Sequence, residues 1–289
     1  MLEDHDKNLF RPVEIEGNIR FPWGKRTFVM GIVNTSPDSF SGDGIHDNVQ
    51  GAVDQALRFE EEGADIIDIG GESTRAFAGK PVYKPITEEE ELRRVIPVLE
   101  KVISVVKVPV SIDTYKSGVA KRAIDTGVAM LNDIWGLQHD YQIASLAAEY
   151  ELPIVLMHNQ KGTEYADLIS DVKEALSRTV AYALEMGISP ENIILDPGLG
   201  FGKKPEHNLQ LINRLGDLKE LGYPLLVGPS RKSFIGLVLD VPIDQRIEGT
   251  SASIAVSIAN GADIIRVHDV KAMVRVARMT DSITRESSP

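Results

Sequence analysis

The sequence contains no cysteine, and this absence excludes disulfide bonds and thiolate metal sites. No apolar stretch approaches the roughly 20 residues that a membrane-spanning helix needs. The first residues, MLEDHDKNLF, lack the apolar core of a signal peptide, so we expect a cytoplasmic protein. Basic residues are too few to balance the acidic ones, and the net charge of -12 argues against nonspecific binding to nucleic acid or an acidic membrane. We therefore expect neither partner, and an anionic substrate would need a local cationic pocket.

What the sequence does contain is a regular alternation of short apolar segments, polar turns and stretches with helical spacing. At 289 residues, with 43% hydrophobic and 26% charged residues, the chain suits either one α/β barrel or two smaller domains. The apolar segments predict strands at residues 27–33, 65–69, 108–112, 129–132, 153–157, 193–196, 225–227 and 263–267. The helical spacing predicts helices at 49–62, 88–105, 117–125, 143–149, 168–186, 207–221, 245–260 and 271–281.

Eight strand-then-helix units without a break in composition predict a single (β/α)8 TIM barrel of the α/β class. We expect this barrel at residues 27–281, after an N-terminal extension (1–26) with a short hairpin and before a flexible tail (282–289). An internal echo supports a repeated unit, because the segment GADII at 63–67 returns at 261–265. The predicted helix stops are glycines: Gly63, Gly127, Gly187, Gly222 and Gly261.

Polar residues collect where the predicted strands end, and barrel enzymes carry their sites at these carboxyl ends. Lys232, Arg266 and His268 follow the last two strands, where barrels commonly bind phosphate, so we expect an anionic, phosphorylated substrate. The segment 230–233 is expected to open a short helix, whose amides would favour a second anion such as a carboxylate. The facing residues suit a flat heterocycle rich in N–H groups, such as a pterin or guanine edge: Asp113, Asn132 and Asp196.

The segment after the first strand, residues 34–44, is a polar loop with one central aromatic residue, Phe40. It has too little apolar surface to hold itself down, so we expect it to be mobile and functional.

Several other polar residues near the strand ends have a structural interpretation that we favour. Asp68, Glu72 and Arg231 are expected to form charge pairs in the barrel mouth. His158 is expected to be a hydrogen-bonded residue of the mouth rather than a base, and Asp133 to orient the adjacent turn.

Six motifs in order along the chain carry a resemblance to a known family. They are MGIVN with PDSFS (30–41), GGESTR (70–75), SIDT (111–114), DPGLGFGK (196–203), GPSRKS (228–233) and GADIIRVHDV (261–270). Any one of them is a weak signal, but six in order are specific. The sequence resembles the dihydropteroate synthase family of pterin-binding barrels over residues 27–271.

The resemblance implies a transferase that condenses a dihydropterin-methyl diphosphate with 4-aminobenzoate, giving dihydropteroate and diphosphate. The resemblance also implies a homodimer and Mg²⁺ as cofactor, held by Asn34. The implied pterin residues are Asp113, Asn132, Asp196 and Lys232, and the implied diphosphate residues are Asn34, Arg266 and His268. Catalytic roles fall to Asn34, Lys232, Arg266 and His268. The implied 4-aminobenzoate residues are Phe40, Thr74, Arg75, Phe201, Lys232 and Ser233, and Asp38 and Asp43 belong to a closing loop.

The first loop departs from the family pattern, in which the common order is Phe-Ser-Asp-Gly-Gly. Here Phe40 and Ser41 are followed by Gly42, Asp43 and Gly44, so the carboxylate moves one position along. Whether Asp43 or Asp38 takes the role of the family's loop aspartate therefore stays open.

Two other functions are compatible with a pterin-binding barrel. A methyltetrahydrofolate:corrinoid methyltransferase shares the barrel but needs no diphosphate site, and the cations at 230–233 and 266–268 argue against it. A catalytically silent pterin-binding protein would be expected to lose phosphate ligands or loop residues, and both persist here.

Overall fold

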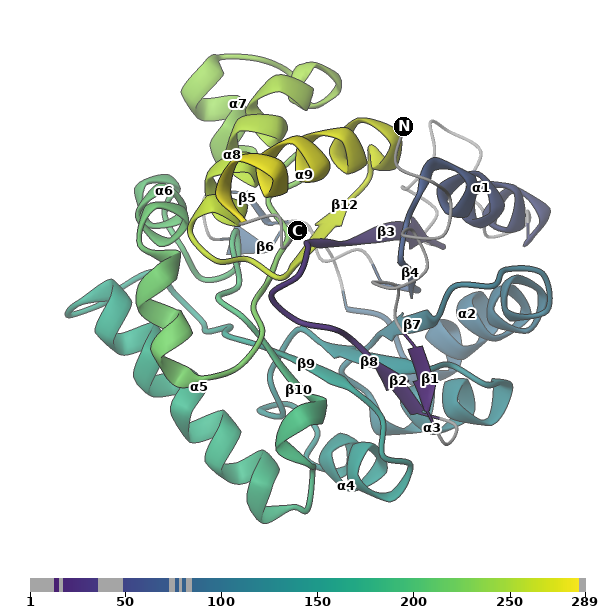
Figure 1. Ribbon diagram of the computed structural model, residues 1–289. Coiled ribbons are helices and arrows are strands. Elements are labelled where there is room, and N and C mark those ends of the chain that lie inside the picture. Colours follow the sequence, from purple (N-terminus) through teal and green to yellow (C-terminus); the bar gives the residue numbers. More distant parts are fainter. Residues whose placement is uncertain are drawn as a thin grey trace.

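The computed structural model describes residues 13–15, 18–35, 49–72, 76–77, 80–81 and 85–285, with side chains for 21–35, 49–72 and 85–285. Eight parallel strands form one sheet in the order β10-β9-β8-β7-β4-β3-β12-β11. A parallel bridge between Leu195 and Leu225 joins the two ends, so the sheet curls into a nearly closed barrel. Helices surround this barrel (Figure 1). The predicted (β/α)8 barrel is confirmed.

The strands lie within two residues of their predicted bounds. They are β3 (Phe28–Asn34), β4 (Ile66–Gly70), β7 (Val110–Asp113), β8 (Met130–Asp133), β9 (Ile154–Met157), β10 (Ile193–Asp196), β11 (Leu226–Val227) and β12 (Ile264–Val267). The predicted hairpin is also present, as the antiparallel pair β1 (Val13–Ile15) and β2 (Asn18–Arg20). A second small pair, β5 (Ala76–Phe77) and β6 (Lys80–Pro81), was not predicted.

The helices follow the predicted spacing closely. They are α1 (Val49–Glu62), α2 (Glu88–Ile103), α3 (Ser117–Thr126), α4 (Gln142–Glu149), α5 (Leu168–Glu185), α6 (Pro205–Asn213), α7 (Ser233–Leu239), α8 (Ile247–Ala259) and α9 (Val270–Thr284), with short 3-10 turns η2 (Pro190–Asn192), η3 (Leu215–Leu221) and η4 (Ile243–Gln245). All five predicted glycine stops have positive φ angles, between 82° and 101°. No helix in the described ranges is long and apolar enough to cross a membrane.

Two predicted helices differ from the observed ones by a break or by more than two residues at one end. The single helix expected at 207–221 is divided at Arg214 into α6 and η3. Gly216 lies two residues further on, and glycine is a poor helix former, so the second part continues only as a 3-10 turn. The last helix runs to Thr284 rather than Asp281, because Arg285 bonds back to Asp281 and to the carbonyl of Ala262. Residues 286–289 of the expected tail lie outside the described residues, and the predicted domain bounds stay predictions.

The core has two layers, as the two faces of the strands require. The larger layer lies between the strands and the helices and includes Val29, Val33 and Phe59. The inside of the barrel is filled near the amino ends of the strands, by Phe28, Met30, Ile66, Met130, Val155, Ile194, Leu226 and Ile264. Phe21 and Trp23 stack on each other and meet Phe28 edge-on. The segment after the hairpin therefore covers the amino end of the barrel, and the site is left to the opposite end.

The GADII echo has a physical reason in the structure. Asp65 accepts the backbone N–H of Val29 at 2.9 Å and two bonds from Arg26. Asp263 accepts the backbone N–H of Leu225 at 2.9 Å and a bond from Lys219 at 2.7 Å. In both copies a buried carboxylate at a helix-to-strand junction ties its strand to the neighbouring strand.

We expect Asp65→Ala to lower the free energy of unfolding by about 3 kcal/mol, because it leaves the Val29 N–H and the Arg26 guanidinium without this acceptor. A matched control is Asp125→Ala, which removes an exposed partner of Lys121 and should cost less than about 1 kcal/mol. Urea unfolding of the wild type and both variants measures the difference. Equal costs for the two variants would contradict the role assigned to the junction carboxylate.

Candidate active site

The centre of the barrel mouth is an ion-pair cluster around Arg266, near the carboxyl end of β12. Its Nε donates to Asp68 Oδ2 at 2.6 Å and its Nη2 donates to Asp113 Oδ2 at 2.6 Å. Asn132 Nδ2 donates to the same Asp68 oxygen at 3.2 Å. One arginine side chain thus reaches across the mouth to β4 and β7, and through Asp68 it is linked to β8.

The charges of this cluster are uneven, because one guanidinium faces two buried carboxylates. Burial raises the pKa of Asp113 to about 7; Arg266 opposes this rise and Asp68 adds to it. Burial by itself would lower the pKa of Arg266, but the charges of Asp68 and Asp113 outweigh it and raise that pKa. Asp113 therefore binds a proton more tightly than an exposed aspartate does, and it can accept hydrogen bonds from N–H groups of a ligand.

A second group of contacts surrounds Lys232, the residue before α7. Its Nζ donates to the carbonyl of Leu199 and lies 4.8 Å from the centre of the Phe201 ring. Burial lowers the pKa of Lys232 to about 8, against the nearby charge of Asp196. Burial also raises the pKa of Asp196, whose Oδ1 accepts the backbone N–H of Gly198 at 2.7 Å. A carboxylate, a lysine and an aromatic ring therefore share this side of the mouth.

The remaining predicted residues lie at the ends of β3, β11 and β12. Asn34 is the last residue of β3 and pairs with Gly70 of β4. His268 Nδ1 lies 3.0 Å from Ser230 Oγ, which also accepts the backbone N–H of His268. Ser233 is the first residue of α7, so the short helix expected after Ser230 is present.

The structure places these predicted site residues at or just beyond the carboxyl ends of the strands: Asn34, Asp113, Asn132, Asp196, Phe201, Lys232, Ser233, Arg266 and His268. Direct contacts join some of them, since Asp113 pairs with Arg266 and Lys232 lies over Phe201. The other predicted site residues lie outside the described residues: Asp38, Phe40, Asp43, Thr74 and Arg75.

The structural roles expected for neighbouring polar residues are confirmed. Glu72 accepts bonds from Tyr115 and Lys116, and Arg231 pairs with Asp269. Asp133 accepts the backbone N–H groups of Trp135 and Leu137, so it does hold the adjacent turn. His158 is hydrogen-bonded to Lys203, as expected.

Sequence reasoning missed two residues of this region. Asp68 forms the expected charge pair but also links Arg266 to Asn132, so it organises the cluster rather than lining it. The available signal was a single acid within an otherwise apolar strand, IIDIG. Lys203 was quoted only as part of a motif, although it is 1% exposed and bonded within the mouth.

No group of three or more His, Asp or Glu side chains in the described part of the chain is arranged to hold a metal ion. Asn34 offers an amide oxygen at a strand end, which is a hard ligand. Magnesium is commonly held by one or two protein oxygens together with substrate phosphates. The residues present therefore fit a magnesium ion that arrives with an anionic substrate.

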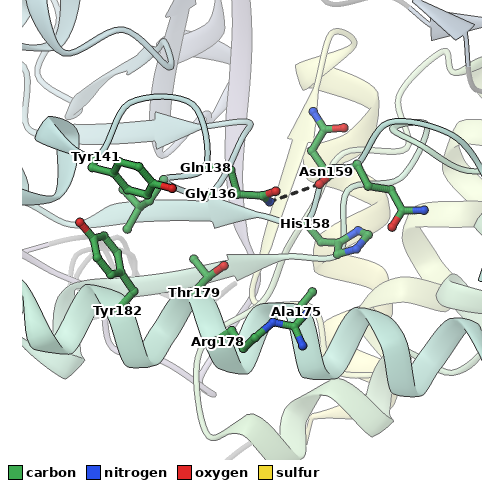
Figure 2. A pocket seen from close by; sticks show the side chains of 11 residues that line it. Gly136, Gln138, Tyr141, His158, Asn159, Ala175, Arg178, Thr179 and Tyr182 are labelled. Carbon is green, nitrogen blue, oxygen red and sulfur yellow. Dashed lines mark hydrogen bonds between the residues drawn. The ribbon is translucent and has the colours of Figure 1, made fainter.

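A cavity of 310 Å³ lies beside the mouth, between the β8–α4 turn, the β9–α5 loop and α5. Figure 2 shows His158 and Asn159 on one side of it and Arg178, Thr179 and Tyr182 of α5 on another. Gln138 closes part of the wall by donating to the carbonyl of Asn159. The residues of the ion-pair cluster around Arg266 do not line this cavity, so the two are separate features.

The charge imbalance at Arg266 predicts a pH dependence of stability. The pKa of Asp113 is raised from 3.8 to about 7 in the folded protein, so the folded state binds this proton more tightly than the unfolded chain. That stabilisation is complete below about pH 4 and is lost as the pH rises through about 7. Relative to Asp113→Asn, the wild type should therefore lose free energy of unfolding between these pH values. Urea unfolding of both proteins across the range measures it, and a constant or rising difference would contradict the assignment.

Comparisons with known proteins agree on one family. The family model described as "Pterin binding enzyme" matches residues 30–268. The dihydropteroate synthase of Clostridium beijerinckii is 48% identical over 270 residues, which are 93% of this chain and 98% of that protein. A crystal structure of the dihydropteroate synthase of Clostridium difficile, determined in the presence of pteroic acid, has 47% identity and a TM-score of 0.88, covering 92% of this chain and 100% of that one. The Xanthomonas albilineans enzyme with 4-aminobenzoic acid has 38% identity and a TM-score of 0.87, covering 96% of this chain and 99% of that one. The chain therefore belongs to the pterin binding enzyme family, among its dihydropteroate synthases.

Proposed function

We propose that this barrel condenses a (7,8-dihydropterin-6-yl)methyl diphosphate with 4-aminobenzoate, in the residue roles set out below. The observation that carries the proposal is the arrangement of acceptors and cations at one end of the barrel: Asp113, Asn132, Asp196, Lys232 and Arg266. Relatives of this chain have been crystallised with 4-aminobenzoic acid and with pteroic acid, which supports both halves of the substrate pair.

The pterin is assigned to the buried acceptors. Asp113 and Asp196 are 8% and 7% exposed, and each retains lone pairs that N–H groups of a flat heterocycle would meet. Asn132 adds an amide, and Lys232 adds a donor beside Asp196. A ligand with several N–H groups would supply the donors that these buried carboxylates otherwise share with Arg266 and the Gly198 backbone.

The diphosphate is assigned to the cationic side of the mouth. Arg266 lies on β12, His268 directly follows the end of that strand, and Asn34 ends the adjacent strand β3. When bound, magnesium would neutralise charge on the diphosphate, with Asn34 as its protein ligand. The contact of Arg266 with Asp113 means that the diphosphate and pterin sites share one side chain, whereas the resemblance assigns Arg266 to the diphosphate alone.

The 4-aminobenzoate is assigned to the side of Phe201, where Lys232 and the start of α7 at Ser233 lie. Phe40, Thr74 and Arg75 are expected to complete this side from the two loops that follow β3 and β4. Asp38 and Asp43 are the candidates for the carboxylate of the closing loop.

The chemistry follows from where the charge develops. The bond between the pterin methylene and the diphosphate oxygen breaks ahead of attack by the weakly nucleophilic aryl amine, so the transition state is cation-like. Arg266 and His268 stabilise the departing diphosphate, while the acceptors Asp113 and Asp196 hold the electron-rich heterocycle. The attacking amine then gives up a proton and the product is dihydropteroate. Water must be kept out, because it would hydrolyse the same cation, and this is the task assigned to the closing loop.

The chain is further expected to form a homodimer and to act in the cytoplasm. Exposed apolar side chains gather on α7 and the following segment, and a subunit interface would cover them: Leu237, Val238, Leu239, Ile243 and Ile247. Sedimentation analysis checks this expectation, and a monomer at micromolar concentration would contradict it.

The experiment that tests the proposed reaction is diphosphate release from the pterin substrate, measured with magnesium and with or without 4-aminobenzoate. We expect release to depend on 4-aminobenzoate and to fall when magnesium is chelated.

Arg266→Ala should lower turnover about 100-fold, because it removes a charged donor to the leaving group. It should also weaken pterin binding, because Asp113 loses its partner. Arg231→Ala is the matched control, since that neighbouring cation pairs with Asp269 and should leave turnover nearly unchanged. Release of diphosphate by the wild type at the same rate with and without 4-aminobenzoate would contradict the proposed reaction.

A further inference from the structure

Lys203 is a lysine buried inside the loop that follows β10. It is 1% exposed, and lysine side chains are almost never buried to this extent unless they are paired. Its Nζ lies 2.9 Å from His158 Nδ1 and 2.9 Å from the carbonyl oxygen of Phe201. Burial lowers the pKa of Lys203 to about 7, and the charge of Asp196 opposes this effect. These contacts hold the amine between the end of β9 and the backbone of the β10–α6 loop.

The partner of Lys203 is itself fixed in place. His158 is 4% exposed, and its backbone N–H donates to the carbonyl of Asp196 at 2.9 Å. Burial lowers the pKa of His158 to about 3, so the ring is neutral. A lysine ammonium has donors only, so towards it His158 Nδ1 must accept, and the ring proton must lie on Nε2. The pair therefore has one defined arrangement while Lys203 is protonated.

The backbone of the loop after β10 packs closely against the backbone of His158. A Cβ atom on Gly198 would lie 2.0 Å from the carbonyl oxygen of His158 and 3.3 Å from Lys203 Nζ. Its φ angle of 72° is one that side-chain-bearing residues rarely adopt. The β9–α5 and β10–α6 loops are thus packed backbone to backbone around the Lys203 amine.

Two lysines bind carbonyl groups of the β10–α6 loop. Lys232 donates to the carbonyl of Leu199 from outside the loop, and Lys203, itself a residue of the loop, donates to the carbonyl of Phe201. Between these two points the loop presents the Phe201 ring, which lies 4.8 Å from Lys232 Nζ. The ring rests on a small apolar cluster that includes Tyr115, Ile134 and Met157. Its position therefore depends on a backbone that Lys203 anchors.

We propose that Lys203 is a positioning residue: held by His158, it fixes the Phe201 carbonyl and so places the Phe201 ring where the aryl amine substrate binds. Lys203 itself does not touch substrate in this arrangement. The inference rests on the proposed function, because it concerns the 4-aminobenzoate side of that same site. It adds a specific difference between the substrates: loss of Lys203 weakens binding of 4-aminobenzoate much more than binding of the pterin diphosphate.

The test compares steady-state kinetics of the wild type and Lys203→Met, which removes the donors and keeps an unbranched apolar chain. We expect the KM for 4-aminobenzoate to rise about ten-fold, with the KM for the pterin diphosphate changed less than about two-fold. His158→Leu should produce the same split. The double variant should be no worse than Lys203→Met alone, because both changes remove one interaction.

A control at a second lysine, one that is itself exposed but pairs with a buried carboxylate, distinguishes positioning from general loss of stability. Lys219→Met removes the cation bound to the buried carboxylate of Asp263, at the amino end of the barrel. It should lower the free energy of unfolding and leave the ratio of the two KM values unchanged. If Lys203→Met behaves like Lys219→Met, or raises both KM values equally, the positioning role is wrong.

A measurement on the wild type keeps the proposal testable if a variant fails to fold. Nitrogen-15 spectra of His158 at a pH below the pKa of Lys203 should show a protonated Nε2 and an unprotonated Nδ1. A proton on Nδ1 would overturn the proposed contact. This measurement does not depend on turnover, so failure of the inference can be told from failure of the proposed reaction. Failure of the proposed reaction would appear as wild-type protein whose release of diphosphate does not depend on 4-aminobenzoate.

Discussion

The interaction on which the rest of the site depends is the sharing of one guanidinium between two buried carboxylates. Arg266 comes from β12, whereas Asp68 and Asp113 come from β4 and β7, so the contact crosses the mouth of the barrel. A single cation cannot fully compensate two carboxylates in a buried setting, and burial together with Asp68 raises the pKa of Asp113. The protein thus keeps a buried acceptor undercompensated, which is an arrangement that favours a ligand carrying N–H donors.

A second constraint is the close packing of the loops behind this cluster. The β10–α6 loop supplies the Phe201 ring and two carbonyl groups that lysines bind, and it lies directly against the end of β9. Such a loop is rigid although it has no regular secondary structure, because its glycines allow the backbones to touch and its carbonyls are anchored. The barrel therefore presents a rigid wall made from a loop, whereas the first loop after β3 was expected from its composition to be mobile.

Much of the fold could be predicted from the sequence, and the reason lies in local patterns. Eight short apolar segments with helical stretches between them require parallel strands with crossover helices, and the glycines at 63, 127, 187, 222 and 261 do end helices with positive φ angles. The break of the helix at Arg214 was missed, because a single glycine such as Gly216 is only a weak signal, and tertiary packing decides whether a helix continues past it. The sequence showed Asp65 and Asp263 only as members of the repeated GADII segment. Their role could not be predicted, because their backbone partners belong to neighbouring strands.

The sequence by itself determined which residue types stand at the strand ends, and hence the barrel, the family and the set of polar groups that face the mouth. This follows because strand ends and turns are set by local pattern, and in a parallel barrel all carboxyl ends meet on one side. Only the tertiary structure decided which of those groups pair. Asp68 contacts residues 64 and 198 positions away, and Lys203 meets His158 from 45 positions away. No local pattern encodes such contacts, because they depend on how far each strand rises and which way each side chain points once the barrel has closed.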